Sequence, residues 1–503
     1  MRRRHKILLA LLGALAVLGG ALAWRIHTWG RPLPVAYRPI AITPADSESG
    51  RSVTYLRTST PGQSARRYVT VDSDADGTVD VVLRAGSVES FARPRADDPE
   101  ARWLVLCVDG VPYAEMLMLW KEGYFREFFR PVPLIAPFPT ASGIALSEAF
   151  HTAPVQGYED GYFDIQRNRL SGGALMTTTG ENIPYLKLLD YDMPGALKGL
   201  AYILPHKSYR ADLGRFRSRF LASHDKIYLA HIASTDSLYH ILPAEEMRRL
   251  LVELDSLLRE LYFDAGGKLR ITLFSDHGNS LAEGHPVPLR EHLEAGGWRL
   301  GNRCGEPRTV VAPAYGLLGF FSIYCAGNTK VELARHLAKM EGVDVVVYKD
   351  WEGLTIENSQ GQAQLSWNQD GTAFRYRPLT ADPLDLAEIL ATLEAEGKMD
   401  AEGWVKDADL FAATRDHFYP DPGHRLWQWA VNHVRNPADL LVSLRPGFHY
   451  GSGTFERIVT MRSTHGSIDP MQTLGFATST DGPLAGTVRS RDLLPADLPA
   501  SKK

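Results

Sequence analysis

Short apolar runs alternate with amphipathic stretches from residue 102 onward. Residues 103–108, 226–232 and 269–274 are almost continuously apolar and have the length of buried strands. Residues 244–263 repeat leucines at a helical spacing, which predicts an amphipathic helix. Strand, helix and strand in this order are typical of an α/β fold, with a mainly parallel central sheet and helices on both faces. Ligands of such folds bind beyond the carboxyl ends of the strands.

The segment 286–454 has a different pattern, and we interpret it as an insertion or cap. The catalytic core would then consist of residues 99–285 and 455–503. Apolar and alternating runs within the cap predict further strands and a helix, at residues 317–324, 331–340, 343–348 and 362–367.

Residues 26–98 predict a small β-rich segment. Two β-prone runs, 68–71 and 79–83, flank an Asp/Gly-rich turn and predict a hairpin. The turn, from Asp72 to Asp80, resembles the first half of a calcium loop, but Leu83 stands where an EF-hand needs its bidentate Glu. A calcium site and a plain hairpin turn therefore both remain open.

The first 25 residues predict an export signal. A basic cluster at residues 2–6 precedes an uncharged apolar stretch, 7–24, which is close to the length that crosses a bilayer. Residues 21–23 also offer the small-x-small pattern of a signal peptidase site. An uncleaved membrane anchor and a cleaved signal peptide both remain open. Either one places the remaining chain outside the cytoplasm, in the periplasm or the extracellular space, and the anchor would tether it to the cell membrane.

Composition limits the functional classes. The chain of 503 residues is 44% hydrophobic and 23% charged, which is typical of a globular protein with a large core. Its net charge is −4 and no basic face is evident beyond the N-terminus, so we expect no nucleic-acid binding. Three cysteines, Cys107, Cys304 and Cys325, are too few for a disulfide scaffold or a thiolate zinc cluster. Cys304 and Cys325 could pair in an oxidising compartment.

Candidate metal ligands follow the three predicted core strands. Asp109 follows the first strand, Asp236 comes shortly after the second, and Asp276 and His277 follow the third. A helix cap or a turn would explain any one of them alone, but not their common placement. Because the carboxyl ends of parallel strands meet at one edge, these groups should converge, and carboxylates with imidazoles suit zinc.

Two further histidines are candidate ligands. His240 stands four residues after Asp236, so on a helix both side chains would lie on one face and could hold one ion. His465 lies late in the chain, beside Gly466, which permits a sharp turn.

The order of these motifs resembles a known family. An Asp after the first strand, a hydroxyl residue after Phe138 and Pro139, Asp-x-x-x-His, Ser-Asp-His-Gly and a late Thr-His-Gly resemble the alkaline phosphatase superfamily. Within it, they are similar to the type I phosphodiesterase/nucleotide pyrophosphatase branch. The match covers about residues 102–285 and 455–497.

This resemblance implies an alkaline phosphatase-like fold and a hydrolase of phosphate esters, either diesters or monoesters. It implies two divalent metal ions, of which zinc is the most expected, and a covalent phospho-enzyme. The ligand sets that it implies are Asp236, His240 and His465 for one ion, and Asp109, Asp276 and His277 for the other.

The resemblance also implies a hydroxyl nucleophile. Family spacing counted from Pro139 predicts Ser142, just before a predicted helix at 144–150, and Thr140 is the alternative. In a third reading Ser142 is only the N-cap of that helix and the site is inactive. The branch commonly has an Asn three residues after the nucleophile, but Ala145 stands there, so the substrate class stays open.

Three other functions are alternatives to this one. A sulfatase would need a Cys/Ser-x-Pro-x-Arg string, and none follows Pro139. A cofactor-independent phosphoglycerate mutase would be cytosolic and would carry a large insert after the nucleophile. A membrane-tethered binding or envelope protein could keep the fold without activity, but all six metal positions hold competent ligand types.

Overall fold

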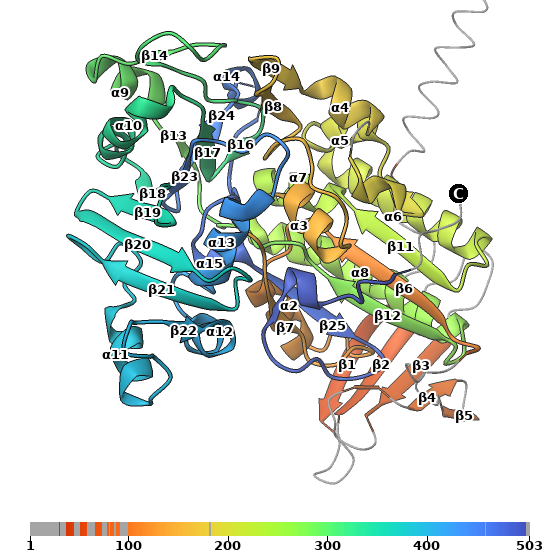
Figure 1. Cartoon of the computed structure of the whole chain (residues 1–503). Coiled ribbons are helices and arrows are strands. Elements are labelled where there is room, and N and C mark those ends of the chain that lie inside the picture. Colours follow the sequence, from red (N-terminus) through yellow and green to blue (C-terminus); the bar gives the residue numbers. More distant parts are fainter. Residues whose placement is uncertain are drawn as a thin grey trace, which may run out of the picture.

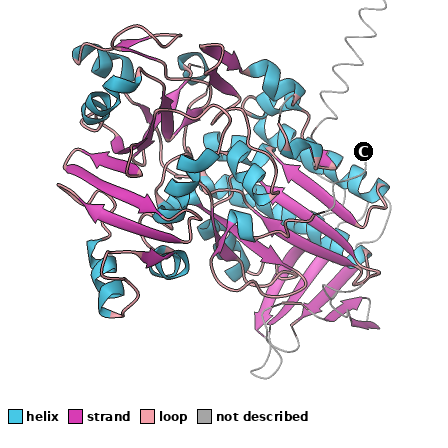
Figure 2. Cartoon of the chain, viewed as in Figure 1, coloured by secondary structure: helices cyan, strands magenta, loops and turns pink. Residues whose placement is uncertain are grey.

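The computed structural model shows a mixed α/β fold with two large sheets, as Figures 1 and 2 show. The residues it describes are 30, 37–44, 51–57, 66–72, 78–79, 81–84, 87–90, 99–180, 183–457 and 459–498. Within these ranges, no helix has the length and apolar character needed to span a membrane. The predicted export segment, residues 1–25, lies outside the described residues.

The central sheet is mainly parallel. Its four neighbouring strands β10, β11, β6 and β12 all run in one direction. Strand β25 is antiparallel to β12 and to β7, and β26 runs parallel to β7. In sheet order the strands are β10 (Tyr191–Asp192), β11 (Ile227–Ile232), β6 (Arg102–Val108), β12 (Leu269–Phe274), β25 (Leu474–Ser479), β7 (Val132–Ile135) and β26 (Val488–Arg489).

Both faces of this sheet are covered, because alternate side chains of β6 enter two different cores. Leu104 and Leu106 pack in a core with α2 (Tyr113–Lys121), α6 (Pro205–Ala222) and α8 (Ala244–Asp264). Val105 and Cys107 pack in a core with α3 (Ser142–Ala149) and with α13 (Pro422–Asn432). The leucines of α8 face the first core, and fully burying one such side chain contributes about 1.5–3 kcal/mol. The predicted helix at 244–263 is therefore α8.

A second, antiparallel sheet lies within residues 320–406 and 440–444. It shares a core with the first sheet, and Figure 1 shows it on the left of the molecule. Helices α9 (Leu289–Ala295), α10 (Lys330–Leu337), α11 (Ala387–Ala395) and α12 (Asp407–Thr414) belong to the same part of the chain. In sheet order its strands are β17 (Phe320–Ile323), β23 (Leu440–Leu444), β18 (Val343–Lys349), β19 (Leu354–Asn358), β20 (Gly361–Trp367), β21 (Ala373–Pro378) and β22 (Val405–Lys406).

The N-terminal part forms a five-stranded antiparallel meander. Its third and fourth strands pair with each other and contain the predicted hairpin. Asp74 and Asp76 lie outside the described residues, so the calcium loop stays a prediction. The strands are β1 (Tyr37–Pro44), β2 (Arg51–Arg57), β3 (Arg66–Val71), β4 (Val81–Arg84) and β5 (Ser87–Ser90).

The remaining elements are short. They are β8 (Gly161–Asp164), β9 (Arg169–Gly172), α4 (Ala174–Thr179), the 3-10 turn η1 (Tyr185–Lys187), α5 (Gly195–Ala201), α7 (Ser234–Ile241), β13 (His285–Pro286), β14 (Arg299–Leu300), β15 (Thr309–Val310), β16 (Leu317–Leu318), η2 (Gly327–Thr329), β24 (Phe448–Gly451), α14 (Gly453–Glu456), α15 (Pro470–Thr473) and η3 (Ser490–Asp492).

Two details differ from the sequence interpretation. The apolar run 317–324 is not one strand, because it divides at Gly319, where a Cβ atom would lie 2.3 Å from Oε1 of Gln472. The two halves then join different sheets. Cys304 and Cys325 are both free thiols, so the structure does not contain the disulfide considered from the sequence. The division into core and cap stays a prediction.

Candidate metal centre

Three core strands end within one residue of each other in the pairing register, and carboxylates follow them at one edge of the sheet. Val108, the last residue of β6, pairs with Ile232, the last residue of β11, and β12 ends one position earlier. Asp109 and Asp276 follow their strands closely, and Asp236 lies in the first turn of α7. Parallel pairing therefore brings these carboxylates together at the carboxyl edge, where α/β folds bind ligands.

Gly110 leaves room for the carboxylate of Asp236 beside the end of β6. Its φ of +68° is left-handed, and a Cβ atom there would lie 2.9 Å from Oδ1 of Asp236. Any larger residue would have to displace that carboxylate, so glycine is required at this position for both reasons.

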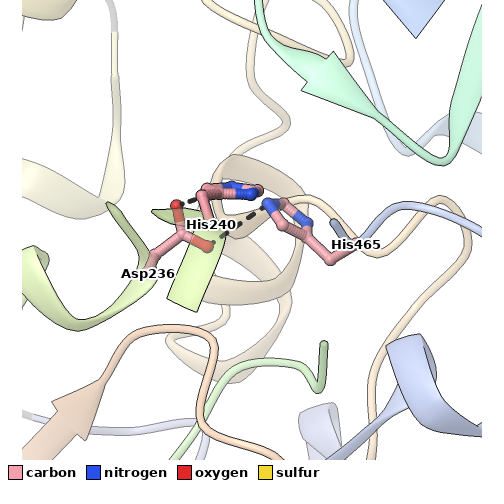
Figure 3. A group of neighbouring side chains, drawn as sticks. All are labelled: Asp236, His240 and His465. Atoms are coloured by element: carbon pink, nitrogen blue, oxygen red, sulfur yellow. Dashed lines mark ion pairs between the residues drawn. The ribbon is translucent and has the colours of Figure 1, made fainter. Parts of the chain in front are cut away.

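Asp236, His240 and His465 form the first of two groups whose geometry suits a metal ion (Figure 3). The aspartate and His240 project from one face of α7, while His465 comes from the loop before α15. Nε2 of His240 lies 3.3 Å from Oδ2 of Asp236, and Nε2 of His465 lies 3.4 Å from Oδ1. One ligand atom from each residue lies within 4.8 Å of the others. The structure brings this predicted set together, and its role as a ligand set stays a prediction.

The second group consists of Asp109, Asp236 and His277, and it differs from the predicted set in one member. Nε2 of His277 lies 3.5 Å from Oδ1 of Asp109 and 3.5 Å from Oδ2 of Asp276. Asp276 nevertheless stays outside the group whose ligand atoms are all within 4.8 Å, and Asp236 takes its place. The other oxygen of Asp276 accepts the N–H of Gly110 at 3.1 Å, which holds this carboxylate against the β6 loop.

The three imidazoles share one hydrogen-bonding arrangement. In each ring Nδ1 donates to a backbone carbonyl, so Nε2 keeps the free lone pair and faces the carboxylates. Metal-binding histidines are commonly oriented in this way. The bonds run from His240 to Ser463 (2.8 Å), from His277 to Gly278 (2.8 Å) and from His465 to Thr140 (2.6 Å).

Asp109 and Asp276 are buried, and Asp236 is half-buried. Among the described residues, Oδ1 of Asp236 and Oδ2 of Asp276 have no hydrogen-bond partner. Burial and then the adjacent Asp109 raise the pKa of Asp276 to about 7. Burial opposes ionisation of Asp236 too, but His240 and His465 outweigh it and hold its pKa far below the usual range. A set of carboxylate oxygens and imidazole nitrogens such as this one fits divalent ions such as zinc.

Ser142 faces the second group, whereas Thr140 does not. Oγ of Ser142 donates to Oδ1 of Asp109 at 3.1 Å and lies 3.2 Å from Nε2 of His277. Thr140 is fully buried, and its hydroxyl accepts the N–H of Gly466 at 2.7 Å. Ser142 therefore lies beside the second group, whereas Thr140 contacts the loop that carries His465, and which of the two is the nucleophile stays a prediction.

The N-cap reading of Ser142 is wrong. Helix α3 begins at Ser142 itself, Ala141 occupies the N-cap position, and no side chain caps the helix. The hydroxyl of Ser142 bonds to Asp109 instead of to the first turn of α3. Ser142 is therefore placed by the helix but does not serve as its cap.

A cavity of about 510 Å³ opens onto both groups, a size typical of small-molecule sites. Ala145 is fully buried in α3 and does not line this cavity, so no donor reaches it from that position. Lys198 of α5 is the one Lys or Arg side chain among the described residues that line it. Apolar and aromatic side chains form much of the remaining wall, including Val155, Met176, Ile183, Tyr185, Leu317 and Phe455.

His231 is a site residue that the sequence reasoning missed. It was read only as part of the apolar strand 226–232, yet Nε2 donates to Oδ2 of Asp109 at 3.0 Å and Nδ1 donates to Oδ1 of Asp192 at 2.8 Å. Burial alone would lower the pKa of His231, but the two carboxylates outweigh it and raise the pKa to about 10. The available signal was an imidazole one position before the end of a buried strand.

No family model and no curated protein sequence match the chain. Human ectonucleotide pyrophosphatase/phosphodiesterase 5 aligns with 12% identity and a TM-score of 0.43, over 78% of this chain and 92% of that one. Murine ectonucleotide pyrophosphatase/phosphodiesterase 5 aligns with 11% identity and a TM-score of 0.42, over 78% and 92%.

A phosphonoacetate hydrolase from Sinorhizobium meliloti 1021, in complex with phosphonoformate, aligns with 12% identity and a TM-score of 0.43, over 82% of this chain and 97% of that one. These proteins are members of the alkaline phosphatase superfamily, which the motif order resembles.

Proposed function

We propose that this protein hydrolyses phosphate esters at a site for two divalent metal ions, through a covalent phosphoserine on Ser142. The observation that carries the proposal is the position of Ser142 Oγ, 3.1 Å from Oδ1 of Asp109 and 3.2 Å from Nε2 of His277. A hydroxyl that lines a cavity beside such a group of side chains supports a nucleophilic role for Ser142.

The residues divide the work in the proposed reaction. Asp236, His240 and His465 would hold one ion, and Asp109 and His277 would hold the other together with Asp236 or Asp276. Bound ions of this kind act as Lewis acids, activating the attacking oxygen and neutralising charge on the phosphoryl and leaving oxygens. Catalytic zinc needs such sets of about three protein ligands, which leave a position open for substrate.

The two chemical steps are a displacement and a hydrolysis. Ser142 Oγ loses its proton and attacks phosphorus, and the ester oxygen leaves as an alcohol after it takes up a proton. Water then attacks the phosphoserine, which releases phosphate or its remaining ester and restores the hydroxyl. The first turn of α3, which starts at Ser142, presents N–H groups that favour a phosphoryl group at this position.

The side chains that line the cavity restrict the choice of substrate more than the metal ions would. Ala145 supplies no donor, so we propose that the ammonium group of Lys198 meets an anionic oxygen of the substrate instead. The apolar wall around it suits an organic ester group larger than a methyl phosphate. Both phosphodiesters and phosphomonoesters remain candidates under this proposal.

Zinc content and turnover together test the proposed function. Purified protein should bind two zinc ions and hydrolyse a chromogenic aryl phosphate or bis-aryl phosphate, and a chelator should abolish this turnover. Zinc binding without turnover of any phosphate monoester or diester would contradict the enzyme and favour a metal-binding protein that kept the fold.

We also propose that the protein acts outside the cytoplasm, held by or released from the N-terminal segment 1–25. The basic residues before the apolar stretch support this proposal. A reporter fused after residue 503 should be active only outside the cytoplasm, and activity only inside would contradict it.

A further inference from the structure

His231 connects a predicted metal ligand to the cavity wall. Its Nε2 lies 3.0 Å from Oδ2 of Asp109, and its Nδ1 lies 2.8 Å from Oδ1 of Asp192. The second oxygen of Asp192 lies 3.0 Å from Nζ of Lys198. Four side chains thus form one continuous series, and Lys198, His231 and Asp109 also line the cavity.

The central sheet fixes the geometry of this series. Asp192 pairs with His231 across β10 and β11, and His231 pairs with Cys107 across β11 and β6. Directly paired residues point to the same face of a sheet. Asp109 comes two positions after Cys107 and returns to that face. The imidazole of His231 therefore stands in the sheet between the two carboxylates, in a row that backbone pairing holds rigid.

This arrangement divides the two oxygens of Asp109 between two tasks. Oδ2 accepts the hydrogen bond from His231, so Oδ1 is left to face Ser142 at 3.1 Å and His277 at 3.5 Å. Without His231, the carboxylate could rotate about its Cβ–Cγ bond, and neither oxygen would have a fixed direction.

We propose that His231, held in turn by Asp192 and Lys198, is a positioning residue that orients the Asp109 carboxylate toward Ser142 and the second ion. The proposal rests on the proposed two-metal function. Hydrogen-bonded partners behind a ligand commonly change metal affinity by about 10- to 100-fold when they are removed.

A calorimetric titration of the metal-free full chain with zinc tests this role. His231→Gln keeps the approximate size of the side chain but cannot bridge both carboxylates. The substitution should lower the affinity for one of the two zinc ions by about 10- to 100-fold, and the affinity for the other by less than about three-fold. Asp192→Asn, at a partly exposed position, should act in the same direction with a smaller loss, which guards against a folding defect in the first variant.

The matched control is His424→Gln, the same change at a buried histidine of α13 outside the ligand groups. It should leave both zinc affinities unchanged. In turnover, His231→Gln should lower kcat by at least about ten-fold with KM within about three-fold, because orientation of the nucleophile matters in the transition state.

The outcomes separate this inference from the proposed function. The positioning role alone would be overturned if His231→Gln bound two zinc ions with wild-type affinity. It would also be overturned if the variant lost affinity equally for both ions and its unfolding temperature fell in parallel. Wild-type protein that binds no zinc would contradict the two-metal function itself. The zinc titration gives a result whether or not an ester substrate has been found.

Discussion

The imidazole rings of His277 and His465 stack with their centroids 3.9 Å apart and their planes 16° from parallel. His465 belongs to the first ligand group and His277 to the second, so the groups form one centre and not two separate sites. Burial and the adjacent His277 lower the pKa of His465 to about 3. Asp236, which belongs to both groups, completes the connection.

Removal of single histidines should separate the two ions. His240→Ala and His465→Ala should each release the first ion, and His277→Ala the second, with activity reduced by roughly two orders of magnitude or more. The fold should persist, since catalytic ligands are rarely what stabilises a core. Zinc content and turnover measure this, with the exposed His151→Ala as the control. Full activity of all three variants in chelator would contradict the metal centre.

Ser142 and Thr140 should differ sharply on substitution to alanine. Ser142→Ala should lose the phospho-enzyme and nearly all activity, with zinc content near that of the wild type, because only the attacking oxygen is removed. Thr140→Ala removes the acceptor of the Gly466 N–H and should lower activity about ten-fold or less.

Acid trapping of the enzyme with substrate, followed by peptide mapping, decides between the two hydroxyls. The phosphate should lie on the peptide that contains Ser142. A phosphorylated Thr140, or a fully active Ser142→Ala variant, would contradict the assignment and leave the metal centre intact.

Sequence patterns predicted the core strands well because burial on both faces leaves a continuous apolar run. The run 269–274 is β12, and 103–108 and 226–232 differ from β6 and β11 by one residue each. Parallel pairing then determines that Asp109 and Asp276 meet, which is why the site could be inferred from strand ends.

The finer geometry depends on contacts that no local pattern encodes. Asp276 stays outside the tight second group because the Gly110 N–H holds one of its oxygens. The role of His231 depends on Asp192, which comes from the edge strand β10, only two residues long. A strand that short gives no periodic signal, so neither it nor the contact could be predicted.

Glu148 should make stability depend on pH. Burial raises the pKa of this carboxyl, whose side chain is 14% exposed, from 4.5 to about 7, with Arg491 opposing the shift. The folded state therefore binds more protons than the unfolded state between pH 4.5 and 7, so the free energy of unfolding falls as pH rises through that window.

Glu148→Gln removes this dependence. Relative to the wild type, the variant should gain up to about 3 kcal/mol of unfolding free energy between pH 5 and pH 8. Urea unfolding at the two pH values measures the difference. Wild-type and variant curves that shift in parallel with pH would show that Glu148 does not titrate in this range.

Arg259 on α8 should be the most costly arginine to remove from the described core. Its Nε donates to Glu127 and its Nη2 to Asp255, both at 2.7 Å, and all three side chains are at most 2% exposed. Arg259→Met would leave two buried carboxylates without their cation, which typically destabilises a protein by about 3–5 kcal/mol.

The control is Arg249→Met on the same helix, whose pair with Glu245 is exposed and should contribute about 0–1 kcal/mol. Urea unfolding of both variants compares the losses directly. Similar losses for the two variants would contradict the prediction that the buried Arg259 cluster contributes more to stability than the exposed pair.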